Sequence, residues 1–121
     1  MPKHNINDFD QLYRRTIVEP AGATSPHRLK LDRVGARSVR VLTHVTVEHK
    51  TAGNVDIRLG IDAGGRDHYL DELTTVVADE LAVSRSDIIL GEGDVFFAKL
   101  TGATAGEELV MSCVGWEQSL K

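Results

Sequence analysis

Apolar and polar residues alternate with a period of two along most of the chain. The clearest case is RSVRVLTHVTVEH, in which Val39, Val41, Thr43, Val45 and Val47 all fall on one face of an extended strand. β-Branched residues at this density favour a strand over a helix. The pattern therefore predicts a long strand here, with its valine row turned towards a core.

The same alternation predicts further strands at HRLKLDR, NVDIRLGID, His68–Leu70, SDIIL, DVFFAKL and EELVMSCVGWE. The joins KTAGN and TGATAGEE are typical of hairpin turns. The secondary structure of residues 70–82 is ambiguous, because leucine and valine fall at helical spacing while TTVV favours a strand. We expect a short strand and an irregular crossing loop here, with a helix as the alternative. We predict an all-β fold, an antiparallel β-sandwich of the jelly-roll or immunoglobulin-like type.

The first 27 residues read differently from the rest. Phe9, Leu12 and Tyr13 have helical spacing behind a possible cap at Asn7 or Asp8, and EPAGATSPH has the composition of a linker. We therefore predict an extended N-terminal arm and linker over residues 1–27, followed by one β-sandwich domain over residues 28–121.

Composition narrows the class of partner. The N-terminus lacks a signal peptide's apolar stretch, no run is long enough for a membrane helix, and the net charge of -4 disfavours nucleic acid. The single Cys113 excludes an internal disulfide and is expected to be a small buried hydrophobe. Ten Lys/Arg against six Asp/Glu give residues 1–60 a charge of +4, whereas four against twelve give residues 61–121 a charge of -8. Either the opposite charges of the two halves pair within the fold, or the protein has one basic and one acidic side that suit docking to a partner.

The sequence contains no clear motif for catalysis, phosphate binding or metal binding. TGATAGEE has acids where a phosphate-binding loop needs lysine, so we expect a turn. The acids Asp62, Asp67, Asp71 and Glu72 lack the spacing of an EF-hand loop, which leaves solvated turns as the expectation and a cation site as the alternative. The histidines and serines lack the settings of a zinc site or a nucleophile. We predict no enzyme activity, catalytic residue, cofactor or metal.

Apolar residues occur on both faces of several predicted strands. In the last strand Leu109, Met111 and Cys113 oppose Val110, Val114 and Trp116. Because a sandwich has a single core, the second face must be covered by the arm, by a crossing loop or by another subunit. The candidate oligomer interface comprises Leu42, Phe97, Val110, Val114 and Trp116.

Two segments, IRLGIDAGGRDHYL and IILGEGDVFFAKLTGATAGEELVMSCVGWE, resemble small β-sandwich virion proteins of tailed bacteriophages, of the capsid decoration (cement) type. The resemblance covers about residues 37–117 and includes Gly115. It implies a homo-oligomer, with a trimer favoured, that is made in the host cytoplasm and binds the major capsid protein lattice on the outer surface of the virion. It also implies a capsid-binding arm, for which the candidate residues are Phe9, Leu12, Tyr13, Arg14 and Arg15.

Two other functions stay open. A ligand-binding module for a host glycan or receptor, as in a fibre or tail component, would use the loop from Asp62 to Glu72. A cupin-like β-barrel enzyme would need His44, His49 and His68 to meet around a metal.

Overall fold

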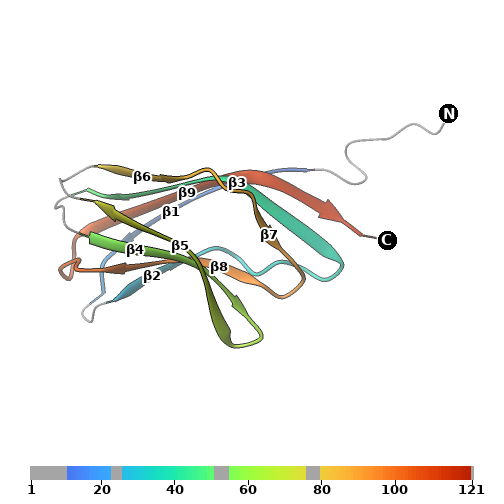
Figure 1. The fold of residues 1–121 in the computed structure, drawn as a ribbon, viewed down its shortest axis with the longest axis horizontal. Coiled ribbons are helices and arrows are strands. Elements are labelled where there is room, and N and C mark those ends of the chain that lie inside the picture. The colour runs from blue at the N-terminus through green and yellow to red at the C-terminus, as the bar shows by residue number, and fades with distance from the viewer. Residues whose placement is uncertain (1–10, 23–25, 51–54, 76–79, 121) are drawn as a thin grey trace.

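The computed structural model describes residues 11–22, 26–50, 55–75 and 80–120, and the strands account for most of them (Figure 1). The strands are β1 (Gln11–Pro20), β2 (His27–Lys30), β3 (Ser38–His49), β4 (Val55–Ala63), β5 (Arg66–Thr75), β6 (Leu81–Ser84), β7 (Ile88–Leu90), β8 (Val95–Thr101) and β9 (Glu108–Ser119). Within these ranges the structure has no helix of the length and hydropathy that a membrane span needs. The all-β prediction is confirmed.

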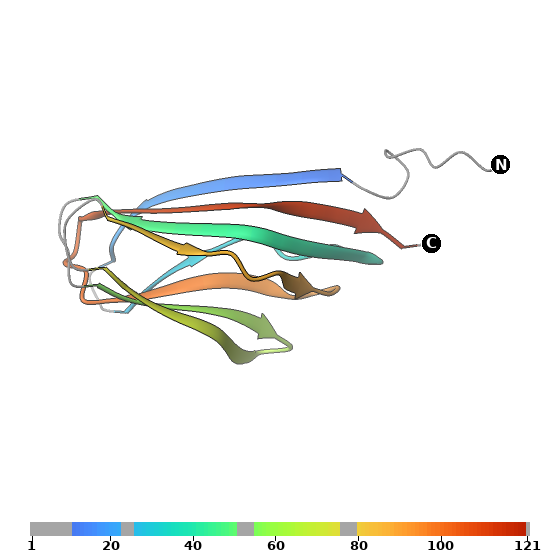
Figure 2. The ribbon, with the colours of Figure 1, turned by 45° about the horizontal axis from the view of Figure 1, so that its top comes forward.

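The strands form two antiparallel sheets that pack face to face, as Figure 2 shows. Sheet A has the order β1-β9-β3-β6, with β7 also paired to β3, and sheet B has the order β2-β8-β4-β5. If β6 and β7 are taken as two parts of one interrupted strand, the first strand pairs with the last, the second with the one before it, and so on inwards. This nested pairing, rolled into two sheets, is a jelly roll.

Inward-facing side chains from both sheets fill the space between the layers. Fully buried members include Leu29, Leu42, Val45, Val47, Val55, Ile57, Leu59, Phe96, Ala98, Leu100, Leu109 and Met111. Cys113 lies among them, and burial raises the pKa of its thiol to about 12. The prediction that Cys113 is a buried hydrophobe is confirmed.

The N-terminal segment differs from the sequence prediction. Residues 11–20, expected as part of an arm with a helical turn, form strand β1, which pairs with β9 from Gln11↔Glu117 to Pro20↔Glu108. Tyr13 and Ile17 point inwards at strand spacing, and tertiary pairing overrides the weak helical pattern. The β-structure therefore begins at Gln11 rather than near residue 28, and residues 1–10 lie outside the described ranges.

A β-bulge divides the valine row of β3. The register with β9 shifts between Leu42, opposite Gly115, and His44, opposite Val114, so that Thr43 is the extra residue. Val45 and Val47 consequently point into the core, whereas Val39 and Val41 are only half-buried. The prediction of one continuous inward row over Val39–Val47 is therefore wrong.

Two of the predicted hairpins are connections between sheets. β3 lies in sheet A and β4 in sheet B, so the strands on either side of KTAGN are not paired; residues 51–54 themselves lie outside the described ranges. β8 and β9 likewise belong to different sheets, and TGATAGEE links them. Consecutive strands β4 and β5 do form a hairpin, and the predicted short strand at His68–Leu70 is part of the longer β5. The ambiguous stretch is β-strand over the part that the structure describes, Leu70–Thr75 and Leu81 onwards.

A buried arginine joins both sheets close to the start of β1. Arg40 on β3 is 2% exposed; its Nε donates to Glu117 Oε2 (2.8 Å), and its Nη1 and Nη2 donate to the carbonyl and Oδ2 of Asp32 (2.7 and 2.9 Å). Tyr13 donates its hydroxyl to Asp32 Oδ1 (2.7 Å) and lies under the Arg40 guanidinium, 4.1 Å from the ring centroid. Because Asp32 follows β2 of sheet B, this network ties the two layers together.

The Asp32 carboxylate makes stability depend on pH. Burial acts to raise the pKa of Asp32, but the hydrogen bond from Tyr13 and the charge of Arg40 outweigh it and hold this pKa below the ordinary 3.8. Folding thus favours the ionised carboxylate, whose stabilisation is complete above pH 3.8 and is lost as the pH falls through the lower folded value.

We expect Asp32→Asn to be less stable than the wild type at pH 7 and to lose less stability than the wild type below about pH 4. The Asp32 side chain is 47% exposed, so solvent screening limits the difference to about 1 kcal/mol. Urea unfolding at a series of pH values measures it. Parallel stability profiles for the two proteins would contradict the assignment.

Candidate interaction surface

The outer face of sheet A carries a row of large apolar side chains that crosses four strands. The register places Leu12 of β1 beside Trp116 of β9, Trp116 beside Val41 of β3, and Val41 beside Ile89 of β7. Leu12, Trp116 and Ile89 are 60%, 47% and 68% exposed. These four residues, here called the apolar row, lie outward because the alternation of each strand sends its other face into the core.

Further outward residues extend this apolar face. A second line, Val18–Val110–Glu48–Leu81, crosses the same sheet at its other end, and Val18 and Leu81 are both exposed. Between the two lines lie hydroxyl groups, with Thr16 Oγ1 3.2 Å from Ser112 Oγ. The face therefore has exposed apolar side chains at its two ends and hydroxyl groups between them.

The predicted interface residues separate into two groups. Val110, Val114 and Trp116 lie on this outer face, and the last two are exposed. Leu42 is wholly buried between the sheets, because the bulge at Thr43 reverses the faces of β3 on either side of it. Leu42 is thus a core residue, and the expectation that it belongs to an exposed second face is corrected.

Phe97 also has no exposed surface, although it lies on the outer side of sheet B. Its ring occupies the space above Gly60, where an added Cβ would come within 2.8 Å of it. The Arg28 guanidinium stacks 4.3 Å from its centroid, and Tyr69 packs against it edge-on at 5.9 Å. Neighbouring side chains of the chain itself cover Phe97, which removes it from the exposed interface.

A row of charged side chains crosses the outer face of sheet B. Across β2, β8, β4 and β5 the register aligns Arg28, Lys99, Arg58 and Glu72, here called the charged row. Arg28 is paired with Asp67, which lowers the pKa of that carboxyl, and Arg58 lies 3.5 Å from Glu72. Exposed apolar side chains thus lie in rows on the outer face of sheet A, whereas the charged row crosses the outer face of sheet B.

The predicted arm residues that the structure describes do not lie on one surface. Tyr13 is buried, and Arg15 turns towards Asp32, with Nε 3.4 Å from Oδ1. Leu12 and Arg14 are exposed on the outer side of sheet A, and Phe9 lies outside the described residues.

The acids of the segment Asp62–Glu72 are engaged within the chain. Asp62 accepts from the Gly65 N–H (3.1 Å), Asp67 from Arg28 (3.1 Å) and Asp71 from Ser84 (3.1 Å), and Glu72 pairs with Arg58. Among the described residues no three of the Asp, Glu, His and Cys side chains are grouped as a metal would require. The structure thus does not bring these acids together around a cation.

The three histidines of the cupin-like alternative lie apart. His44 is on the outer face of sheet A, whereas His68 is exposed on β5 of sheet B. His49 is buried, with Nε2 3.1 Å from Glu107 Oε1. The convergence that this enzyme would need is absent from the described part of the chain.

The loop TGATAGEE turns the chain from sheet B to sheet A. Gly102 and Gly106 have φ values of 106° and 88°, which L-residues with a side chain rarely adopt. Gly106 N–H donates to the Ala21 carbonyl (2.9 Å), and Glu107 accepts from the Thr104 N–H. The expectation that the loop is a turn with Gly at positive φ is confirmed, although it links two sheets rather than closing a hairpin.

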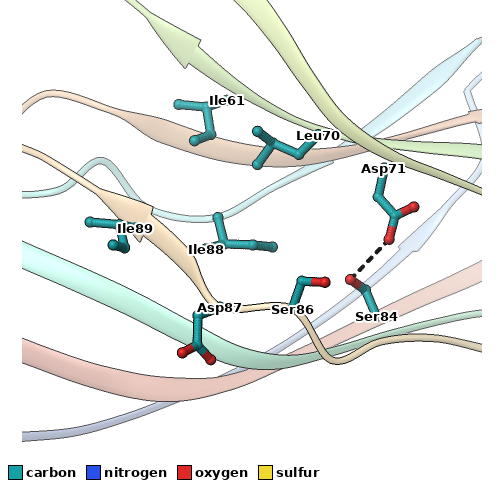
Figure 3. A pocket seen from close by; sticks show the side chains of 8 residues that line it. All are labelled: Ile61, Leu70, Asp71, Ser84, Ser86, Asp87, Ile88 and Ile89. Atoms are coloured by element: carbon teal, nitrogen blue, oxygen red, sulfur yellow. Dashed lines mark hydrogen bonds between the residues drawn. The ribbon is translucent and has the colours of Figure 1, made fainter.

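A groove of about 330 Å³ opens between the edge strands β5 and β6–β7 (Figure 3). It is lined by Ile61, Leu70, Asp71, Ser84, Ser86, Asp87, Ile88 and Ile89. Ser84 donates to Asp71, and no histidine, lysine or cysteine occurs among the described lining residues. The serines therefore lack the neighbouring base that an activated nucleophile uses. Sequence reasoning did not find this groove, because it forms between edge strands of two different sheets, and the sequence pattern does not show which sheet each strand joins.

Comparisons with known proteins support the fold. No family model matches the chain, and no curated protein matches it. A solved structure of a protein from Bacillus endospore appendages, a family of disulfide-linked pili, is 14% identical over 100% of this chain and 98% of its own, with a TM-score of 0.53. A structure of infectious bursal disease virus Gt strain is 8% identical over 92% of this chain and 32% of its own (TM-score 0.49). A chain from the structure of the virus-like particle of the giant freshwater prawn Macrobrachium rosenbergii extra small virus is 15% identical, over 100% of this chain and 86% of its own (TM-score 0.43). At 14% identity, the likeness to the endospore appendage protein shows a shared fold alone.

Proposed function

We propose that the protein is a non-enzymatic structural subunit that attaches to a larger protein assembly through the outer face of sheet A. The observation that carries this proposal is the apolar row Leu12–Trp116–Val41–Ile89, in which Leu12, Trp116 and Ile89 are exposed. Water-exposed aromatic and aliphatic side chains in a continuous line are costly in a free subunit and favourable at a contact. The charged row on the opposite face suits the side that stays in solvent.

More specifically, we propose a capsid decoration protein that binds the major capsid protein lattice on the outer surface of a virion and acts as a homo-oligomer. The resemblance to bacteriophage decoration proteins, which implies a trimer, supports this choice. Repetition of the subunit strengthens attachment, because each bound copy makes the next contact of its oligomer intramolecular. Capsid contact from the N-terminal region would then use the predicted Phe9 together with the exposed Leu12 and Arg14.

Noncovalent packing is the linkage that this chain supports. The pilus protein with the similar fold is described as disulfide-linked, whereas this chain has the single Cys113, which is 1% exposed. Burial also holds this thiol protonated at neutral pH. A buried, protonated thiol is poorly placed to form a disulfide with another protein, so attachment would rest on noncovalent contacts.

Trp116 provides both the test and the probe, because it is the only tryptophan in the chain. We expect Trp116→Ser to weaken co-sedimentation with capsids built from the major capsid protein of the virus that encodes the chain by roughly 30-fold, the effect of losing an aromatic anchor. The control, Tyr69→Ser, removes an aromatic residue that is 42% exposed on the opposite face and should change binding less than about threefold.

Wild-type fluorescence gives an independent readout. Trp116 emission should shift to shorter wavelength, and quenching by acrylamide should fall, when the protein binds capsids. Bound protein whose Trp116 remains as quenchable as in the free protein would refute docking through sheet A. Equal loss of binding in the two variants would do the same.

A further inference from the structure

The four sheet edges of the sandwich are not equally protected. The edge strands β2, β6 and β7 have four, four and three residues. Edge strand β5 carries a register shift that leaves Leu70 unpaired with β4. Strand β1, in contrast, runs for ten residues with no register shift and pairs on one side only within the described chain, at the margin of sheet A (Figure 2).

A long, regular edge presents a row of unpaired backbone N–H and C=O groups, which is a template for another strand. Natural edges are usually blunted by short length, bulges, proline or charged side chains. β1 is long and has no bulge and no proline before Pro20, and its charged residues are Arg14, Arg15 and Glu19. Its outward side chains at this edge, Leu12, Arg14, Thr16 and Val18, are all exposed. The edge is therefore long and regular enough to accept another strand.

We propose that β1 pairs antiparallel with β1 of a second copy of this chain, about a twofold axis at Thr16, so that the two A sheets become one continuous sheet. Thr16 then lies opposite Thr16 of the other copy, Arg14 opposite Val18, and Leu12 opposite Pro20. Backbone hydrogen bonds supply the attraction, and the side-chain pattern fixes the register.

The charges of β1 select this register. A shift that places Arg14 or Arg15 at the axis sets like charges directly opposite each other, which destabilises a pair of strands. A shift that places Ile17 at the axis shortens the pairing to Arg14–Pro20 and brings together Arg15 and Glu19, which already contact Asp32 and His27 within their own chain. Thr16 at the axis gives the longest pairing without a like-charge contact, and threonine opposite threonine is a favourable cross-strand pair.

This contact has a structural consequence for the apolar face. With Thr16 at the axis, side chains on the outer faces of both copies lie on the same side, so the two apolar rows form one surface. The pairing uses the edge of sheet A and not its face, and it goes beyond the proposed docking to a capsid. It predicts a dimer as the basic unit, in place of the trimer that the resemblance implies.

Cross-linking through position 16 tests the register directly. In Thr16→Cys, mild oxidation should convert most of the protein into a disulfide-linked dimer, because residues opposite each other in antiparallel strands lie within disulfide reach. Arg14→Cys is the control: it is on the same edge and face but opposite position 18, and should give about tenfold less dimer. Wild type, whose Cys113 is buried, should give none. Failure of Thr16→Cys to exceed Arg14→Cys would overturn the proposal.

A charge exchange tests the same contact without oxidation. Val18→Arg sets arginine opposite Arg14 at two symmetric places and should raise the dimer dissociation constant about tenfold. Adding Arg14→Glu to this variant restores an opposite-charge pair and should return the constant to within about threefold of wild type. A wild-type protein that stays monomeric at about 100 µM in light scattering, or a double variant that is not rescued, would overturn the pairing. Neither outcome depends on capsid binding, so the two proposals can fail separately.

Discussion

Gly115→Ala is expected to destabilise the protein by about 3 kcal/mol, which corresponds to a fall of about 10 °C in Tm. A Cβ at Gly115 would lie 1.8 Å from the Val41 carbonyl oxygen and 2.8 Å from the Leu42 Cα. Both contacts are to backbone, so no side-chain rotation relieves them. Because the bulge at Thr43 brings these atoms towards Gly115, the alanine must open the β3–β9 pairing or remove the bulge.

Gly35→Ala is the matched control, since a Cβ there meets nothing within 4 Å and its φ does not lie in the left-handed region. It should leave Tm unchanged or slightly raised, because alanine restricts the unfolded chain. Thermal unfolding followed by circular dichroism compares the two variants. A Gly115→Ala protein that melts with the Gly35→Ala protein would show that the close approach is not a constraint on stability.

The second large effect is expected for Arg40→Met, which keeps an unbranched aliphatic side chain but removes the guanidinium. Asp32 and Glu117 then face each other's charge without the cation, and Tyr13 loses the group that stacks on its ring. Removal of one partner from a buried ion pair typically costs 3 kcal/mol or more. Because the two acids are 47% and 31% exposed and regain water, we expect a loss of about 2 to 3 kcal/mol.

Arg58→Met serves as the control, because the Arg58 side chain is 51% exposed and its ion pair with Glu72 is a surface pair at 3.5 Å. The variant should lose less than about 0.5 kcal/mol of stability. Urea unfolding at pH 7 and near pH 3 separates charge from packing. The penalty of Arg40→Met should shrink at the lower pH, where the acids become protonated. A penalty independent of pH would assign the role of Arg40 to packing alone.

Alternation identified strands but not their sheets. The pattern of NVDIRLGID was sufficient to predict β4 and the inward positions of Val55, Ile57 and Leu59, since each inward residue is apolar and each outward one is polar. Nothing in KTAGN or TGATAGEE indicates that the chain changes layers there, because a short Gly-containing turn serves a hairpin and a crossover equally well. Strand partners depend on long-range packing, which a local pattern does not encode.

The exposed residues of the candidate interface were predicted only in part, because long-range packing also decides which side chains reach the surface. The apolar residues on both faces of the last strand correctly indicated that Val114 and Trp116 point away from the core. Leu42 was misplaced because one bulge residue, Thr43, reverses the faces of the strand beyond it, and Phe97 because Arg28 and Tyr69 cover it from other strands. A signal for β1 was present in Thr16-Ile17-Val18, three consecutive β-branched residues that favour a strand over an arm.

The pairing of β1 with β9 determines when sheet A can be completed during synthesis. The strand that begins at Gln11 has its neighbour at Glu108–Ser119, so the nascent chain carries β1 without a partner until nearly all of the described sequence has left the ribosome. Contacts between residues so far apart in sequence slow folding, and they leave a long, aggregation-prone strand unpaired during synthesis. In a crowded cell, chaperones that bind extended segments would have their main opportunity in that interval.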